Sequence, residues 1–218
     1  PQCEEDLLSY LQSQNIGKPK YIFATHPHAD HIGSMAAVVD TFGCENFIMP
    51  EMVSYTRTFE NMLSSVEQAG CQTAYGVAGD TFTLGDAQLK LLWPTEGFDA
   101  SDPNEISLVL QVTYGEYSFL LTGDAGKDAE EGFLSQVQPV TVLKAGHHGS
   151  NTSSTEAFLQ KAQPEYVVIS VGAGNSYGHP SPAMLERLDE NCQVLRTDEK
   201  GSIVFTVKEG ELHVSTAR

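Results

Sequence analysis

Two periodicities of apolar residues divide the chain. In its first third, apolar positions at helical spacing alternate with short apolar runs. These patterns predict helices at residues 3–14, 35–42 and 59–66, separated by strands at 21–24, 47–49 and 73–75. From residue 81 the period falls to two, and glycine turns predict two hairpins, 81–84 with 88–93 and 106–112 with 117–121.

The remainder returns to alternating helices and strands. It contains a predicted helix ending near residue 135, strands at 140–143 and 166–171, helices at 153–159 and 182–188, and final strands at 193–195, 202–207 and 212–214. Ser153 and Glu156 have the spacing of a capping box for the helix through residue 159. No repeat or linker-like stretch interrupts the 218 residues, so we expect a single α/β domain spanning 1–218.

Polar clusters directly follow four of the predicted apolar strands. They occupy residues 25–31, 122–124, 144–153 and 172–179. Six of the seven histidines lie in these clusters, and only His213 stands apart. Because strand ends in α/β sheets assemble sites from distant parts of the chain, we expect these clusters to form one site.

The first cluster carries the most specific chemistry. Three imidazoles and one carboxylate fall within residues 26–31, which predicts a metal site formed by His26, His28, Asp30 and His31. His26 and His28 share a direction at a strand end, whereas Asp30 and His31 fall in the turn that opens the next helix. A solvated loop or a helix N-cap would explain single members of this set, but not all four together.

Further metal ligands are expected from the later clusters. Two metal ions about 3.5–4 Å apart can share one carboxylate, and Asp124, between small neighbours, is the candidate bridge. A turn aspartate is the alternative for the Gly-Asp dipeptide alone. Adjacent residues point apart, so one of His147 and His148 is expected to bind metal while the other turns toward substrate or a carboxylate; which one stays open.

Two segments offer contacts to an anionic substrate. Residues 150–153 stand at a predicted helix N-terminus, where free N–H groups favour phosphate oxygens, although an ordinary helix cap is the alternative. The glycine-rich strand exit at 172–179 ends in His179, which could steady a phosphoryl oxygen or protonate a leaving group, or could be a simple turn residue. The predicted catalytic residues are Asp30, Asp124 and His179, and the predicted substrate contacts are Ser150, Asn151, Asn175, Tyr177 and His179.

Composition narrows the partners. The formal net charge of −17, from 29 acidic against 12 basic side chains, makes a poor surface for a polyanion. No apolar run approaches the roughly 20 residues of a membrane span, so this chain itself is expected to make no membrane contact. Four cysteines without CxxC spacing disfavour a cysteine zinc site and leave the compartment undecided.

The first cluster matches the HxHxDH signature of the metallo-β-lactamase fold. Residues 104–110, 120–124, 143–150 and 175–180 are in addition similar to the metallohydrolase domain of ComEC-type competence proteins. The resemblance spans about residues 20–206. It implies a four-layer αββα sandwich with a dinuclear zinc or manganese site at one edge, and it favours an extracellular or cell-surface location.

The chain departs from that family in two ways. Many dinuclear members supply a further histidine before the bridging aspartate, but no histidine lies between His31 and His147, where Asn104 or Asp102 would have to stand in. The first N-terminal strands of the fold are also not evident, because residues 1–3 lead at once into a predicted helix. We therefore expect an upstream segment or a partner strand to pair with the strand at 21–24, since proteins usually cover open sheet edges.

Together these patterns predict a metal-dependent hydrolase. Water on such metal ions loses a proton at a pKa of about 7, which provides hydroxide at neutral pH. Phosphodiesters are the expected substrates, and the ComEC-like resemblance implies nuclease action on DNA, with short or single-stranded DNA suiting the acidic surface. The alternatives are a small-phosphoester hydrolase such as a phosphorylcholine esterase, and a metal-binding module without catalysis.

Overall fold

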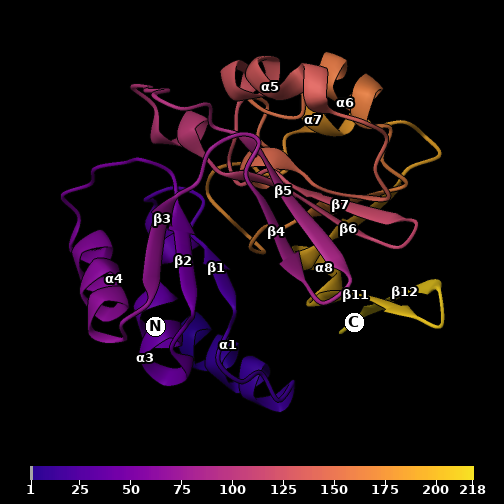
Figure 1. Ribbon diagram of the computed structural model, residues 1–218. Helices are drawn as coiled ribbons and strands as arrows, with labels where there is room; N and C mark the ends of the chain where they lie inside the picture. Colours follow the sequence, from indigo (N-terminus) through magenta and orange to yellow (C-terminus); the bar gives the residue numbers. More distant parts are fainter. Residues whose placement is uncertain (1) are drawn as a thin grey trace.

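The computed structural model describes residues 2–218, with side chains described from residue 4 (Figure 1). Two facing β-sheets lie between outer layers of helices, which is the four-layer αββα arrangement that the resemblance implies. The first sheet has three parallel strands in the order β1 (Tyr21–Phe23), β2 (Asn46–Met49) and β3 (Gln72–Tyr75). Its helices are α1 (Gln2–Ser13), α2 (Ala29–Ile32), α3 (Met35–Phe42) and α4 (Arg57–Gln68).

The apolar spacing that predicted α4 is the face that this helix buries. In α4, Phe59, Met62 and Val66 pack into a cluster with Val39 of α3 and Phe47 of β2. The hydroxyl of Thr56 accepts a hydrogen bond from the Phe59 N–H at 3.3 Å and so caps the N-terminus of α4. This cluster forms the outer core of the three-stranded sheet.

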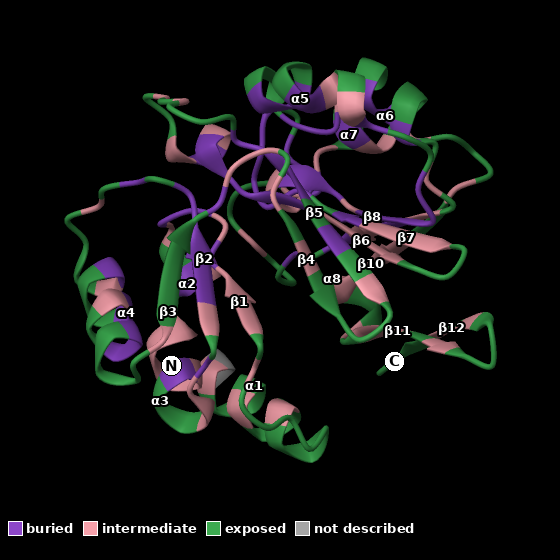
Figure 2. Cartoon of the chain, viewed as in Figure 1, coloured by how far each residue is buried: buried purple, intermediate pink, exposed green. Residues whose placement is uncertain are grey.

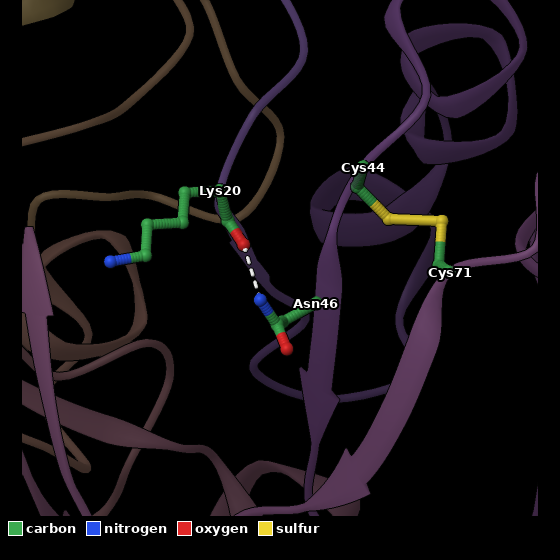
Figure 3. Close-up of a disulfide and its surroundings, with 4 residues drawn as sticks. All are labelled: Lys20, Cys44, Asn46 and Cys71. Carbon is green, nitrogen blue, oxygen red and sulfur yellow. Dashed lines mark hydrogen bonds between the residues drawn. A yellow bond between two sulfur atoms is a disulfide. The ribbon is translucent and has the colours of Figure 1, made fainter.

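A disulfide between Cys44 and Cys71 joins the segments that enter β2 and β3 (Figure 3). Their Cα atoms lie 5.5 Å apart, within the usual range for such a bond. On the other side of β2, the Asn46 side-chain amide donates to the Lys20 carbonyl at 2.9 Å, just before β1 begins. All three strands are therefore tied together at their starting ends, a pairing that cysteine spacing could not indicate.

The second sheet has seven strands in the order β10-β9-β8-β7-β6-β5-β4. Both predicted hairpins are present, and each pairs antiparallel, whereas β7, β8, β9 and β10 pair in parallel. The strands are β4 (Thr81–Leu84), β5 (Ala87–Trp93), β6 (Val109–Tyr114), β7 (Tyr117–Leu121), β8 (Val142–Lys144), β9 (Tyr166–Ile169) and β10 (Gln193–Arg196).

Separate apolar clusters fill the spaces on the two faces of this sheet. Between the sheets, Ile48 of β2 packs against Leu89 and Leu91 of β5. On the outer face, α5 (Lys127–Phe133), α6 (Glu156–Ala162) and α7 (Pro182–Leu185) bury Phe133, Phe158 and Met184 (Figure 2). The helices thus cover the face of β8 and β9 that carries Leu143, Val167 and Ile169.

Several predicted boundaries were wrong. The strand expected from residue 106 begins at Val109, because Asp102 accepts the Asn104 N–H at 2.9 Å and starts a 3-10 turn, η1 (Pro103–Ile106). Helix α6 is capped by Thr155 and not by Ser153. Short elements η2 (Leu134–Gln136), η3 (Gly146–Gly149) and α8 (Thr197–Lys200) were not anticipated, and β11 (Ile203–Lys208) pairs with β12 (Glu211–Thr216) as a separate ribbon.

Strand β1 pairs with β2 on one side and with no other strand in the described part of the chain. The upstream or partner strand expected at this edge stays a prediction. No helix within residues 2–218 has the length and apolar content needed to cross a membrane.

Candidate metal centre

The four polar clusters meet where the strands of both sheets end. The exit of β1 carries His26 and leads into α2, while β7 leads directly to Asp124. His26 Nε2 lies 3.8 Å from Asp124 Oδ2, which joins residues from the two sheets. β8 leads into η3 with its histidine pair, and the ring of His179, beyond β9, lies 5.7 Å from the ring of His147. The expectation of one shared site is therefore met in space.

Four side chains form a compact tetrad, namely Asp30, His31, Asp124 and His148. The His31 and His148 Nε2 atoms lie 3.1 Å apart, and they lie 3.2 Å and 3.4 Å from Asp124 Oδ2. Asp30 Oδ2 completes the group at 3.2 Å from His148 Nε2 and 3.8 Å from His31 Nε2. These atoms come from α2, the exit of β7 and η3, so the tetrad forms only when the two sheets are assembled.

The tetrad has the dimensions of a metal site. Ligand atoms about 2.0–2.1 Å from a tetrahedral zinc ion lie about 3.3 Å from one another. Four of the separations found here, 3.1–3.4 Å, are close to that value, and the whole set lies within 4.8 Å. Two imidazole nitrogens facing each other beside a carboxylate need a shared cation or proton between them. Imidazole and carboxylate donors together suit zinc, manganese or iron.

A second, looser group surrounds the same oxygen. His26 Nε2 and His147 Nε2 lie 3.8 Å and 4.0 Å from Asp124 Oδ2, and the ring of His28 lies 4.8 Å from the ring of His26. His26 Nε2 is buried and has no hydrogen-bond partner among the described residues, while the hydroxyls of Thr25 and Ser107 contact its Nδ1. This orphaned nitrogen fits a metal ion that Asp124 would share between both groups.

The local backbone places the later ligands. His147 and His148 both adopt left-handed φ angles of 44° and 53°, which are uncommon outside glycine and concentrate at functional sites. In this turn both Nε2 atoms come within 4.0 Å of Asp124 Oδ2, but only His148 belongs to the tetrad, so the expectation that one of the pair binds metal stays a prediction. Gly123 also has a positive φ of 55°, and a Cβ there would lie 2.9 Å from Ser107 Cβ, so this turn accommodates only glycine.

Burial and neighbouring charges set the protonation states. Burial lowers the pKa of His26 to about 3, which leaves the imidazole neutral at neutral pH. Burial would raise the pKa of Asp124, but hydrogen bonds from His148 and His31 and the charge of Lys144 outweigh it and hold that pKa well below its usual range. The hydrogen bond to Asp124 in turn raises the pKa of His148.

The glycine-rich loop places His179 beside this centre. Its ring also lies 6.0 Å from the ring of Tyr177, at an interplanar angle of 19°, and Tyr177 is 82% exposed. Burial lowers the pKa of His179, and its Nδ1 is buried without a partner among the described residues. Asn175 does not face a substrate: its side chain bonds to the backbone of Gly172, Tyr177 and His179, and it therefore shapes the loop.

The anion site expected at residues 150–153 is already occupied by the protein. The N–H groups of Ser150, Thr152 and Ser153 donate to the His147 carbonyl, the Ser150 hydroxyl and the Ser150 carbonyl. The carboxylate of Glu130, on α5, accepts the next two N–H groups, those of Ser154 and Thr155. Ser150 is buried, and its hydroxyl contacts Thr152. Asn151 stays within reach of a substrate because it lines the cleft beside the metal centre.

That cleft has a volume of about 550 Å³, and its walls include Asp124 and His147. Acidic residues outnumber basic ones in its lining, which holds Asp102, Glu105, Asp128 and Glu156 beside Asp124, against Lys127 and Arg187. Asn104 also lines it, and its buried Oδ1 has no partner in the described part of the chain, whereas the Asp102 carboxylate caps η1. Of the two substitutes for the missing histidine, Asn104 is therefore the one with a buried, unpartnered oxygen.

Several supporting residues were missed in the sequence. Ser107 accepts the Asp124 N–H at 3.1 Å, and Arg187 donates to the carbonyls of Asn151, Ser153 and Ser154, which braces the loop before α6. Lys144 donates to the Gly123 carbonyl. Lys144 lay inside the predicted cluster at 144–153, which is a positional signal. Ser107 and Arg187 had none, because they lie 17 and at least 33 residues from their partners.

Comparisons with known proteins agree with this geometry. The sequence matches the family described as the Metallo-beta-lactamase superfamily over residues 2–173. It is 32% identical over 208 residues to ComE operon protein 3 of Bacillus subtilis, covering 94% of this chain and 27% of that protein. It is 28% identical over 217 residues to Recombination protein 2 of Haemophilus influenzae, covering 99% of this chain and 26% of that protein.

The chain therefore spans about a quarter of the length of these curated relatives. Among solved structures, the metallo-beta-lactamase fold protein YhfI from Bacillus subtilis aligns with a TM-score of 0.51 at 10% identity, over 81% of this chain and 74% of that chain. This likeness concerns the fold alone. It agrees with the αββα layers, and the sequence matches confirm the resemblance drawn from the motifs.

Proposed function

We propose that this chain, which belongs to the metallo-β-lactamase superfamily, is a metal-dependent hydrolase that cleaves phosphodiesters. The observation that carries the proposal is the tetrad of Asp30, His31, Asp124 and His148, with donor separations that suit a divalent metal ion. His26, His28 and His147 would hold a second ion, with Asp124 shared. Zinc or manganese are the expected metals, because the donors are imidazoles and carboxylates.

Bound metal ions would polarise a phosphoryl oxygen and make water acidic enough to attack it. The remaining steps belong to residues of the chain. Neutral His26 and ionised Asp124 are ready to bind cations without first losing protons. His179 lies beyond His147, where it would donate a proton to the leaving oxygen or steady the phosphoryl group.

The two ions are expected to bind unequally. The tetrad is compact, whereas the second group is looser, with the His26 and His147 Nε2 atoms 3.8 Å and 4.0 Å from Asp124 Oδ2. One equivalent should therefore resist mild chelation better than the other. Two equivalents of indistinguishable affinity would contradict this part of the proposal, and a single tight equivalent would favour the metal-binding module.

DNA is the phosphodiester that the relatives suggest, since one of them is named a recombination protein. Only short or single-stranded DNA suits this chain, because its surface is strongly acidic. The Arg187 guanidinium, in addition, already donates hydrogen bonds to the loop before α6. The exposed ring of Tyr177 offers a surface on which a base could stack.

The acidic residues that line the cleft favour a second candidate function. A quaternary ammonium group would be attracted to Asp102, Asp128 and Glu156 while its phosphate reached the metal centre. The same catalytic residues would then act as a phosphorylcholine esterase. An upstream segment or partner strand beside β1 stays part of either proposal.

A substrate panel on metal-loaded protein tests these alternatives. The panel contains single-stranded and duplex oligonucleotides, bis-p-nitrophenyl phosphate, p-nitrophenylphosphorylcholine, a phosphomonoester, a lactone and a β-lactam. Asp124→Asn is the matched variant, because it keeps the side-chain volume but removes the charge shared between two cations. Hydrolysis by wild type alone supports the proposal, while equal turnover by Asp124→Asn at full metal content would place the bridge elsewhere.

A further inference from the structure

Lys144 contacts the oxygen of Asp124 that faces away from the candidate ligands. Its Nζ lies 3.5 Å from Asp124 Oδ1, whereas four imidazole nitrogens lie within 4.0 Å of Oδ2, those of His26, His31, His147 and His148. The two carboxylate oxygens therefore have different neighbours. One faces a fixed ammonium group, and the other faces the proposed metal positions.

The sheet itself sets this division. In the parallel pair of β7 and β8, Lys144 stands opposite Leu121, so its side chain reaches the residues that follow β7. The Thr122 hydroxyl donates to the Lys144 carbonyl at 2.8 Å, which fixes the end of β8. The Lys144 side chain is only 18% exposed, and its ammonium also donates to the Gly123 carbonyl. An ammonium held in this way has little freedom to leave Oδ1.

We propose that Lys144 is a positioning residue that restricts Asp124 to its Oδ2 atom, so that one oxygen is presented to both metal positions. This inference rests on the proposed metal centre. Without the ammonium, either oxygen of Asp124 could turn toward a cation, and the carboxylate would serve one ion at the expense of the other. The Gly123 turn would keep its second tie, because its carbonyl also accepts the His147 N–H at 3.3 Å.

Lys144→Met tests the proposal, because it keeps an unbranched side chain of similar length and removes the charge. Lys144→Arg is the matched variant that keeps a cation. Metal affinities are measured by calorimetry with Zn²⁺ and Mn²⁺, and coordination is followed by the visible absorption of Co²⁺-loaded protein. In Lys144→Met we expect the weaker equivalent to lose about 10–100-fold in affinity, as loss of a partner that orients a ligand typically does. The Co²⁺ spectrum should change as well, and Lys144→Arg should recover part of both effects.

The controls separate the possible failures. Thermal unfolding of the metal-free variants should match wild type within a few degrees if the turn survives. If wild type binds two equivalents and Lys144→Met binds both with unchanged affinity and spectrum, the positioning role is refuted. Equal weakening of both sites together with a lower melting temperature would also refute it. That result would mean that Lys144 stabilises the turn as a whole and does not position Asp124. A wild type that binds no divalent metal would refute the proposed function itself.

Discussion

The two sheets supply the candidate metal centre in opposite ways. The three-stranded sheet delivers His26, His28, Asp30 and His31 from one loop and the helix turn after β1. The seven-stranded sheet delivers Asp124, the histidine pair and His179 from the ends of three strands that are neighbours in space. One sheet therefore provides a local motif, and the other provides a shared carboxylate whose position depends on strand order. Neither contribution makes the tetrad alone.

The largest expected effect comes from removing one tetrad ligand on either side. His31→Ala and His148→Ala should abolish binding of the same metal equivalent, because their Nε2 atoms lie 3.1 Å apart. We expect metal affinity to fall by more than the roughly 10–100-fold that is typical when a residue that orients a ligand is removed. Elemental analysis after dialysis against a weak chelator measures it, with His213→Ala on β12 as the control. Loss of different equivalents in the two variants would show that the sheets serve separate sites.

The contribution from the glycine-rich loop should affect turnover but not metal content. His179→Ala is expected to lower kcat by about 10²–10⁴-fold, the usual range for a general acid or base. Metal content and kcat are measured on the same preparation, and Tyr177→Phe serves as the neighbouring control because it keeps the stacked ring. Metal release from His179→Ala would mean that this histidine is a ligand.

The three-stranded sheet depends on its covalent link. The bond between Cys44 and Cys71 closes a loop with a sequence separation of 27, so the double variant Cys44→Ala/Cys71→Ala should lose roughly 3–4 kcal/mol of unfolding free energy. Urea unfolding measures the loss, and Cys192→Ala, which removes a free cysteine, is the control. Hydrogen exchange should increase first in β1–β3. Uniform acceleration across β7–β9 would contradict an effect confined to one sheet.

The smallest expected effect is that of salt. Because few basic side chains stand near the centre, binding of single-stranded DNA should fall with a log–log slope no steeper than about −2, equivalent to two or three phosphates at most. Titration between low and physiological salt measures this slope. Tight binding of long duplex DNA with a steep slope would contradict the argument from the acidic surface.

The contiguous part of the site was readable from the sequence because its residues are neighbours in the chain. Asp124, His148 and His179 were also predicted, since each follows an apolar strand, and strand exits meet at one edge. The roles of Ser150 and Asn175 were misjudged because their partners, Thr152 and the loop backbone, depend on side-chain rotamers and not on pattern. The role of Glu130 could not be predicted for a similar reason. In the sequence, a buried carboxylate that accepts the N–H groups before α6 cannot be told from an exposed acidic residue of a helix.

The fold shows the same limit. Periodicity located nearly all helices and strands, because apolar faces repeat at fixed spacing. It failed at η1, where the Asp102 side chain binds the backbone and starts a 3-10 turn in place of a strand. It also failed at His147 and His148, whose left-handed backbone is usual only for glycine. Such local exceptions lie next to the candidate metal centre, where structure departs from the regular preferences of the chain.

The disulfide of the three-stranded sheet has a consequence for sample preparation. Protein made in a reducing cytosol would contain Cys44 and Cys71 as thiols. A thiolate is a strong zinc ligand, and Cys71 is partly exposed whereas Cys44 is fully buried. Zinc added to a reduced sample would therefore meet a competing donor far from the histidines, and the metal count would include it. The oxidised protein is the form in which stoichiometry reports on the histidine centre.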